Sequence, residues 1–262
     1  YIADIETCAV LHPSVGNRLM DLRVLINGLS IPDRIPQIEV AIGDASVGLV
    51  FRHLAAFNDT DIMALTEFQN STGIGIYLQP GAEHTVHALS EATAALSYCV
   101  DGVTFDFLAT DFTQVNGHMN RTMVEFVIGQ LQLTATDRVL DLFCGLGNFS
   151  LPLARPVSGV VGIEGSAELV SRARENAVGN NIDNATFSQA DLTDEIDISK
   201  IDMQGFTKLL LDPPRTGANE IVNTLDLSAL HRIVYVSCNP VTLARDTKNI
   251  LAKYNFELIG AG

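Results

Sequence analysis

Basic residues are scarce in this sequence, and the scarcity limits what the chain can bind by charge. Its 262 residues include 16 Lys and Arg against 31 Asp and Glu, a formal net charge of −15 at pH 7. Proteins that hold a nucleic acid backbone by charge alone need clustered Lys and Arg side chains. Neither the part before residue 98 nor the part after it is basic. The composition argues against a protein that binds a phosphate backbone in that way.

Long apolar runs are also lacking. No stretch approaches the roughly 20 residues that cross a bilayer, and no basic-then-apolar signal segment opens the chain. The four cysteines, at positions 8, 99, 144 and 238, lack the spacing of a disulfide scaffold, so we expect a reducing, cytoplasmic setting. What is present is 47% apolar residues, enough for a packed core. The chain starts without Met and ends in a strand-like run, which predicts a piece of a longer protein.

The pattern before residue 98 predicts a small α+β domain, residues 1–97, whose role the sequence does not disclose. Its expected elements are a helix over 13–27, strands over 37–42 and 47–54, a helix over 61–70 capped by Asp59 or Thr60, and a strand over 73–79. A hairpin with strands at 98–100 and 103–109 follows, and we place the boundary at its start.

From residue 116 onward, strands alternate with helices. The expected strands are 138–143, 159–164, 185–190, 208–212 and 232–237, and the expected helices are 116–133, 148–154, 167–180, 218–224 and 241–253. This alternation predicts an α/β fold with a mostly parallel, doubly wound sheet over residues 98–262. Ligands of such sheets bind beyond the carboxyl ends of the strands.

The first motif at a strand end is a glycine loop, Asp141-Leu-Phe-Cys-Gly-Leu-Gly-Asn-Phe149. Gly145 and Gly147 permit a tight turn and close approach of a ligand. Glu164 ends the next strand, where a carboxylate can accept hydrogen bonds from both ribose hydroxyls. The loop lacks the third glycine of dinucleotide sites, so a nucleoside without pyrophosphate, S-adenosylmethionine above all, fits better. Asp191 would bind the adenine amino group. A purely structural turn with an unrelated surface Glu is the alternative.

Two further motifs end the later strands. In Leu211-Asp-Pro-Pro-Arg215 the prolines stop the strand and fix Asp212 beside the glycine loop, unless Asp212 only terminates the strand. In Ser237-Cys-Asn-Pro240 a cysteine lies just before a helix, whose N-terminus favours a thiolate. Because buried cysteines are usually inert, we expect Cys99 and Cys144 to be inert and Cys238 to be the nucleophile.

A fourth segment, Asp111-Phe-Thr-Gln-Val-Asn116, precedes the helix that leads into the sheet. Gln114 and Asn116 could contact a ligand or cap that helix, and Asn is a residue type that caps well. The segment alone does not decide between the two.

Together the four segments resemble the RNA 5-methyluridine methyltransferases, and in particular the bacterial 23S rRNA (uracil-5-)-methyltransferases. The resemblance is densest from about residue 111 to 250. It rests on the glycine loop, on Leu210-Leu-Asp-Pro213 and on Ile233-Val-Tyr-Val-Ser-Cys-Asn-Pro-Val-Thr-Leu-Ala-Arg-Asp246. It implies that Cys238 is the catalytic nucleophile. It also implies that residues 98–262 form the methyltransferase domain, with the class I (Rossmann-like) sheet of S-adenosylmethionine-dependent methyltransferases. The implied S-adenosylmethionine contacts are Gln114, Phe143, Asn148, Glu164, Asp191 and Asp212, although at 191 relatives carry Asn.

The resemblance also implies features that this sequence does not contain in full. The family carries a [4Fe-4S] cluster on four cysteines, of which Cys8 resembles the fourth and the other three are absent. An N-terminal RNA-binding TRAM domain is absent as well, and the general-base Glu is expected beyond Gly262. We therefore expect these residues alone to bind cofactor with little or no catalysis.

The implied reaction starts with addition of the Cys238 thiolate to C6 of a flipped or single-stranded uridine in 23S rRNA, after which C5 accepts the methyl group. The missing domain and Arg121, Arg215 and Arg245 would supply RNA affinity, and no membrane or protein partner is implied. One alternative is a tRNA 5-methyluridine methyltransferase. A second is an amino-group methyltransferase that uses Asp212-Pro-Pro, and a third is a non-enzymatic domain that binds an adenosyl ligand or RNA. A 5-methylcytidine enzyme is disfavoured, because Pro213-Pro214-Arg215 lacks the Pro-Cys that such enzymes carry.

Overall fold

The computed structural model describes residues 4–261, and the chain divides into two compact units. The first comprises Tyr1–Tyr98 and Asp106–Val115, and the second comprises Cys99–Phe105 and Asn116–Gly262. Within the described residues, no helix is long and apolar enough to cross a membrane. The functional division at residue 97 stays a prediction.

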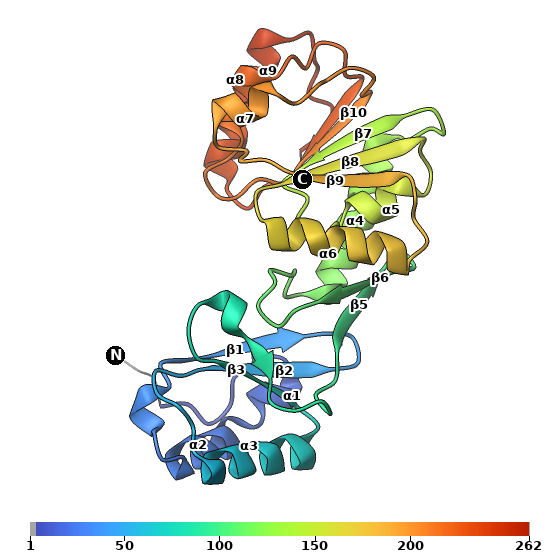
Figure 1. The fold of residues 1–262 in the computed structure, drawn as a ribbon. Helices are drawn as coiled ribbons and strands as arrows, with labels where there is room; N and C mark the ends of the chain where they lie inside the picture. Colours follow the sequence, from blue (N-terminus) through green and yellow to red (C-terminus); the bar gives the residue numbers. More distant parts are fainter. Residues whose placement is uncertain (1–3, 262) are drawn as a thin grey trace. The chain divides into compact units, whose positions relative to one another are not determined.

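The first unit is built on a four-stranded mixed sheet (Figure 1). Its strands, in spatial order, are β1 (Gln37–Ile42), β2 (Val47–Arg52), β3 (Gly75–Gln79) and β4 (His87–Ala88), with only the β2–β3 pair parallel. Leu49, Phe51, Ile76 and Leu78 face a core shared with the helices. Those helices are α1 (Pro13–Gly16), α2 (Leu19–Gly28) and α3 (Asp59–Thr72), with 3-10 turns η1 (Pro32–Arg34) and η2 (Glu83–Thr85).

Two local predictions for this unit were wrong. In place of the single helix expected over 13–27, the structure has two helices, α1 and α2, with Asn17 and Arg18 between them. The N-cap of α3 is Asn58, whose side chain accepts the Asp61 N–H while the Asp61 carboxylate accepts the Asn58 N–H. This reciprocal capping box satisfies two backbone donors and outcompetes a cap at Asp59 or Thr60.

A two-stranded hairpin of β5 (Leu96–Val100) and β6 (Val103–Phe107) contributes residues to both units. The second unit then forms a five-stranded sheet in the order β11-β10-β7-β8-β9, in which every neighbouring pair is parallel. Its strands are β7 (Arg138–Leu142), β8 (Gly159–Glu164), β9 (Ala185–Gln189), β10 (Lys208–Leu211) and β11 (Arg232–Tyr235). The predicted α/β class with a parallel sheet is confirmed.

Helices cover both faces of this sheet (Figure 1). One face carries α4 (Gly117–Leu131), α5 (Ser150–Ala154) and α6 (Ala167–Gly179), and the other carries α7 (Glu195–Ser199), α8 (Asn219–Thr224) and α9 (Pro240–Lys253). The short helix α7 was not predicted. On the second face, apolar side chains of β7 and β10 pack with α8 and α9 into one core, including Leu140, Leu209, Ile221 and Ile250.

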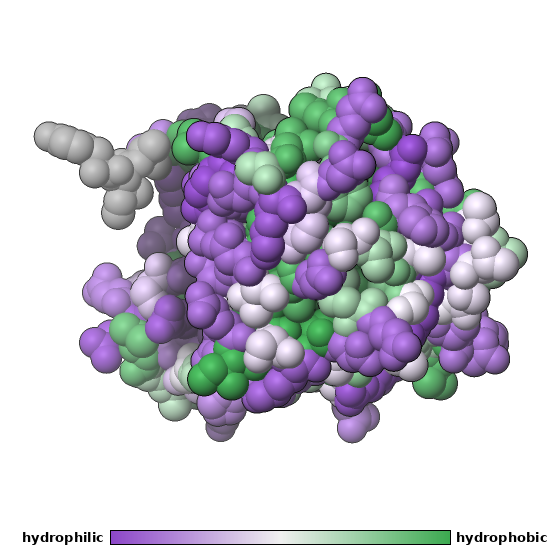
Figure 2. Space-filling view, turned by 90° about the horizontal axis from the view of Figure 1, so that it is seen from above, coloured by the Kyte–Doolittle hydropathy of each residue, from purple (hydrophilic) through white to green (hydrophobic). Residues whose placement is uncertain are grey.

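Strand order reverses beside β7, because β8 lies on one side of it and β10, which comes later in the chain, lies on the other. Crevices for ligands form at such reversal points, outside the carboxyl ends of the strands. The glycine loop follows β7 and the Asp212 loop follows β10, so both lie at the reversal. The surface drawn in Figure 2 mixes hydrophilic and apolar residues.

Candidate active site

The glycine loop after β7 has a backbone that few side chains allow. Phe143, Gly145 and Gly147 all have positive φ, of 65°, 55° and 91°. The amides of Phe143 and Cys144 both donate to the Ile163 carbonyl, at 2.9 and 3.2 Å, which ties the loop to β8. A Cβ on Gly145 would meet nothing within 4 Å, so this glycine serves the conformation and leaves open space beside the loop.

Glu164, the last residue of β8, lies beside that loop. Its Oε2 accepts the Gly145 N–H at 3.1 Å, and its Oε1 accepts the Ser166 N–H at 3.1 Å. Each carboxylate oxygen has a second lone pair, so the half-buried group is oriented and can still accept from a ligand. This geometry suits a ligand with two adjacent hydroxyls.

A second carboxylate, Asp141 in β7, is fully buried beneath the loop. Its Oδ2 accepts from the Ser150 hydroxyl, whereas its Oδ1 has no partner among the described residues. Burial, helped by the nearby charges of Asp212 and Glu164, raises the pKa of Asp141 to about 7. Burial likewise raises the pKa of Asp212 to about 6. The site therefore concentrates acidic groups, and apart from hydrogen bonds the causes of these pKa shifts are burial and neighbouring carboxylates, with no charged Lys or Arg acting on Asp141 or Asp212 in the described part of the chain.

The loops after β10 and β11 adjoin, because these strands are parallel neighbours with Leu211 opposite Tyr235. Cys238 lies within a small turn, in which the Ser237 hydroxyl accepts the Asn239 N–H at 3.1 Å. The Asn239 side chain caps α9 through the Val241 N–H and donates to the Arg215 carbonyl at 2.9 Å. The Cys238 turn and the Asp212 loop are therefore bonded to each other.

The four cysteines differ in exposure. Cys238 is exposed, as a nucleophile must be, and Cys144 is buried. Burial, with the nearby Asp141 and Glu164 charges, raises the pKa of the Cys144 thiol well above its usual value, which disfavours the reactive thiolate. Cys99 is exposed, so the expectation that it is buried was wrong, and its inertness stays a prediction. Side chains alternate between the two faces of a strand, and in β5 the buried Leu96 and Val100 lie on one face, so Cys99 lies on the other.

Cys8 is half-buried, and its amide donates to the Gly16 carbonyl at 3.1 Å. Residues 4–261 contain no group of three or more His, Cys, Asp or Glu side chains that could hold a metal ion. One thiol does not fit an iron–sulfur cluster by itself.

The remaining predicted contacts occupy different surroundings. Asn148 exchanges two hydrogen bonds with Asn120 of α4, each at 2.9 Å, and this pair fixes its orientation. Asp191 is exposed and accepts from the Thr193 N–H and hydroxyl. Asn116 caps α4 by accepting the Met119 N–H at 3.0 Å, so the capping interpretation holds for it. Gln114 is half-buried in the first unit, and its role stays a prediction.

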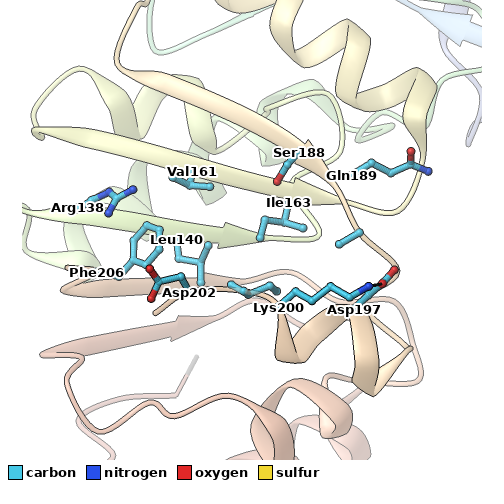
Figure 3. A pocket seen from close by; sticks show the side chains of 12 residues that line it. Arg138, Leu140, Val161, Ile163, Ser188, Gln189, Asp197, Lys200, Asp202 and Phe206 are labelled. Atoms are coloured by element: carbon cyan, nitrogen blue, oxygen red, sulfur yellow. Dashed lines mark hydrogen bonds and ion pairs between the residues drawn. The ribbon is translucent and has the colours of Figure 1, made fainter. Parts of the chain in front are cut away.

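A groove of about 460 Å³ lies against β7, β8 and β9 in the same unit (Figure 3). Leu140, Val161 and Ile163 lie between Arg138 and Phe206 at one end and Lys200 and Asp197 at the other. The charged side chains at its two ends already have partners within the chain. Lys200 donates to Asp197 at 2.7 Å, and the Arg138 guanidinium stacks on Phe206 and donates to the Gln204 carbonyl. The groove also reaches Ile163 and Ala190, the residues just before Glu164 and Asp191.

Two features of the site were missed at the level of sequence. Asp141 interrupts an otherwise apolar strand, and a charged residue in such a strand signals a special role. Asp246 interrupts the inner face of α9 in the same way, and it is fully buried. The partners of Asp141 and Asp246 on other elements, Ser150 for the first and Tyr235 and Ala218 for the second, could not be found from local pattern.

Comparisons with known proteins agree with this geometry. The sequence model of a family described as tRNA (Uracil-5-)-methyltransferase matches residues 44–258. A protein of Alkalilimnicola ehrlichii is 47% identical over 265 residues, and one of Nitrosococcus oceani is 50% identical over 263. Both are named 23S rRNA (uracil(1939)-C(5))-methyltransferase RlmD. The matches cover 100% of this chain but 60% and 59% of those proteins, so the chain spans about three fifths of their length.

A solved structure has a similar fold. The Pyrococcus abyssi tRNA (uracil-54, C5)-methyltransferase, in complex with S-adenosyl-L-homocysteine, superposes with a TM-score of 0.73. The likeness covers 95% of this chain and 64% of that one, at 22% sequence identity. At this identity the similarity shows the fold, which agrees with the predicted Rossmann-like methyltransferase architecture.

Proposed function

Because the chain belongs to the tRNA (uracil-5-)-methyltransferase family, we propose that it supplies the cofactor-binding and nucleophilic parts of an enzyme that methylates C5 of a uridine in 23S rRNA. The choice of 23S rRNA is supported by the names of the relatives at 47% and 50% identity. The observation that carries the reaction is the exposed Cys238 thiol at the same sheet edge as Glu164 and the glycine loop.

The spacing along that edge suits two ligands side by side. Glu164 ends β8 and Cys238 follows β11, with β7 and β10 between the two strands. Neighbouring strands lie about 4.8 Å apart, so these two ends are roughly 14 Å apart. This span leaves room for a nucleoside held at Glu164 and a pyrimidine ring next to Cys238, with Asp212 between.

The residues of the site fit S-adenosylmethionine, which when bound supplies an electrophilic methyl group on a positively charged sulfur. The unpartnered Asp141 Oδ1 and the half-buried Asp212 form an acidic surround, which a cationic ligand would stabilise. Glu164 binds the ribose hydroxyls. The Ala190 N–H donates to the Glu164 carbonyl at 3.1 Å, so Asp191 follows close by for the adenine amino group. Gln114, Phe143, Asn148 and Asp212 complete the proposed contacts.

The nucleophile makes the target carbon reactive. The Cys238 thiolate forms an S–C bond to uracil C6, and the electrons of the C5–C6 double bond shift towards C4 and its oxygen as an enolate. C5 then forms a bond to the methyl carbon as the bond from that carbon to the cofactor sulfur breaks, and the sulfur leaves with that electron pair as a neutral thioether. A base removes the C5 proton, the double bond re-forms, and the Cys238–C6 bond breaks to return the thiolate. We propose that this base lies in sequence beyond residue 262, and that residues 1–262 alone bind cofactor with little turnover.

RNA recognition has to operate despite the acidity of the chain. A base must leave its stack to reach a thiol at a sheet edge, so the target is a flipped or single-stranded uridine. Of the three arginines considered, Arg121 donates to the Cys99 carbonyl and Arg245 pairs with Asp246. The Arg215 guanidinium has no hydrogen bond or ion pair within the described residues. Arg215 is the cation we propose for a phosphate near the target.

The deciding experiment is mass spectrometry of the full-length protein incubated with cofactor and 5-fluorouridine RNA. Fluorine at C5 cannot leave as a proton does, so the covalent complex persists, and we expect a peptide adduct at Cys238. Cys238→Ala should abolish both the adduct and methyl transfer. Cys99→Ala is the matched control, since it removes another exposed thiol, and should retain both. Methyl transfer retained by Cys238→Ala would exclude the covalent route and favour an amino-group methyltransferase.

A tRNA substrate is the second candidate, favoured by the description of the matching family. Competition between a 23S rRNA fragment and a tRNA transcript, both uridine-containing, distinguishes the two: the ratio of kcat/KM values identifies the preferred RNA. Cytoplasmic location and a [4Fe-4S] cluster that includes Cys8 remain proposals for the full-length protein. Iron content of anaerobically purified protein, with and without Cys8→Ala, tests the cluster.

A further inference from the structure

Asp246 is a buried carboxylate that bonds its own helix to two other segments of the site, the end of β11 and the loop after β10. It lies in α9 with 0% of its surface exposed. Its Oδ2 accepts the Tyr235 hydroxyl and the Ala218 N–H, both at 2.7 Å, and its Oδ1 accepts the Arg245 Nε–H at 2.7 Å. Ala218 N also approaches the Tyr235 hydroxyl oxygen at 3.1 Å. Every oxygen of this carboxylate is therefore bonded, and none can reach a substrate.

The partners connect the two loops on which the proposed reaction depends. Tyr235 ends β11, three residues before Cys238, and Ala218 closes the loop that begins at Asp212. The same loop is bonded again to α9, since Arg245 Nη2 donates to the Thr216 carbonyl at 2.9 Å. The Asp246 carboxylate, bonded to Tyr235 and Ala218, therefore connects the Cys238 turn with the Asp212 loop, and we call these three residues the Asp246 anchor.

Gly217 shows how closely that loop approaches the anchor. Its φ is +83°, and a Cβ there would lie 2.5 Å from Asp246 Oδ2 and 2.9 Å from Thr242 Cβ. No side chain fits in that space, so the backbone of the loop packs directly on α9.

The anchor carries a charge. Burial acts to raise the pKa of the Asp246 carboxyl, but hydrogen bonds from Arg245, Ala218 and Tyr235 outweigh burial and hold it below its usual value. An ionised acceptor makes stronger hydrogen bonds than a neutral one, so the three links are stiff.

We propose that Asp246, with Tyr235, is a positioning group that fixes the Cys238 thiol relative to the Asp212 loop, and this inference rests on the proposed function. Reacting atoms must be held at near-contact distances, and a displacement of about 1 Å can cost about 100-fold in rate. Loss of the anchor leaves the end of β11 and the Asp212 loop joined through exposed bonds such as that from Asn239 to the Arg215 carbonyl, and so loosens their relative placement. The cofactor contacts proposed at β7 and β8, the glycine loop and Glu164, do not depend on these links, whereas the contact proposed for Asp212 does.

The test uses the full-length protein and separates positioning from stability. Tyr235→Phe removes one hydroxyl and keeps the ring, and Asp246→Asn removes the charge. Tyr254→Phe is the matched control for the first, because its hydroxyl donates to the Leu225 carbonyl at 2.6 Å in the same core. Asp137→Asn is the control for the second, being a buried carboxylate bonded to Thr134 and Thr207 at the amino end of the sheet.

We expect Tyr235→Phe to lower the single-turnover rate of methyl transfer about tenfold and Asp246→Asn about 100-fold. At saturating S-adenosylmethionine the rate of adduct formation with 5-fluorouridine RNA should fall in parallel. The Kd for S-adenosylmethionine should rise by less than about tenfold, because only the Asp212 contact is loosened while Glu164 and the glycine loop keep theirs. Both controls should lower Tm and leave the rate within about twofold.

A Tyr235→Phe protein that reacts as fast as wild type would overturn the proposal, even if Asp246→Asn failed to fold. Rates that fall equally in Tyr235→Phe and Tyr254→Phe would also overturn it, since the effect would then be one of stability. A wild-type protein that forms no 5-methyluridine would instead refute the proposed function, and this inference with it.

Discussion

The Glu164 carboxylate accepts the Gly145 backbone N–H at 3.1 Å, which links the end of β8 to the loop after β7. The link orients the group proposed to hold the ribose, and it gives the first prediction. Glu164→Gln should weaken S-adenosylmethionine binding by about 10- to 100-fold, because hydrogen bonds to a charged acceptor contribute about 1.5–3 kcal/mol. Isothermal titration calorimetry measures the change. Glu168→Gln, on the surface of the following helix, should leave the Kd unchanged, and equal affinities of the two variants would contradict the assignment.

The buried Asp141 predicts a pH dependence of stability. Its pKa rises from 3.8 to about 7 on folding, so the native state binds more protons than the unfolded chain between these values. The favourable contribution of the Asp141 carboxyl to the free energy of unfolding is therefore present at low pH and is lost as the pH rises towards 7. Asn at position 141 does not titrate, so Asp141→Asn does not lose stability in this way. The free energy of unfolding of the variant minus that of wild type should increase from pH 4 to 7 by at most ~4 kcal/mol, and then level off.

Urea unfolding of the cofactor-free protein across this pH range measures the Asp141 effect. The same variant should bind S-adenosylmethionine more weakly, because the Asn side chain lacks the negative charge of the carboxylate whose Oδ1 is unpartnered. A difference between variant and wild type that is constant with pH would mean that Asp141 does not titrate on folding.

Arg215 is expected to contribute to RNA affinity through charge. Arg215→Ala should weaken binding of a uridine-containing RNA and reduce the slope of log K against log salt by about 0.7–0.9, the value for one phosphate contact. Fluorescence anisotropy at several salt concentrations gives the slope. Arg172→Ala is the control, since Arg172 pairs with Glu175 on α6 at 2.6 Å. An unchanged slope in Arg215→Ala would remove Arg215 from the RNA-binding surface.

Gly162 in β8 gives a prediction about packing beneath the glycine loop. A Cβ there would lie 2.6 Å from the Phe187 ring and 2.8 Å from the Cys144 sulfur, both buried. Gly162→Ala should destabilise the protein by about 1–3 kcal/mol. Gly129→Ala in α4 meets nothing within 4 Å and should stabilise by up to about 1 kcal/mol. Chemical denaturation of both variants provides the comparison, and a stable Gly162→Ala protein would show that Phe187 can move.

Local pattern accounts for the elements that the sequence predicts well. The bounds of β1 and β8 agree with expectation, and the helix after Asn116 begins where an Asn cap predicts it. Apolar periodicity and turn residues act over a few positions, so they can be recognised without the fold. Where several neighbours offer the same local signal, as in the run Asn58-Asp-Thr-Asp61, the choice of cap depends on reciprocal hydrogen bonds that pattern does not distinguish.

The amino-acid sequence by itself determined the alternation of strands and helices, the glycine loop with its Glu164 partner, and the motifs that carry Asp212 and Cys238. Tertiary structure alone decided which of these loops adjoin, because the order of β7, β10 and β11 depends on pairing between distant segments. It also decided the exposure of Cys99 and the burial of Asp141. The Asp246 anchor joins residues up to 28 positions apart, and such bonds form only once the strands have been brought together in the sheet.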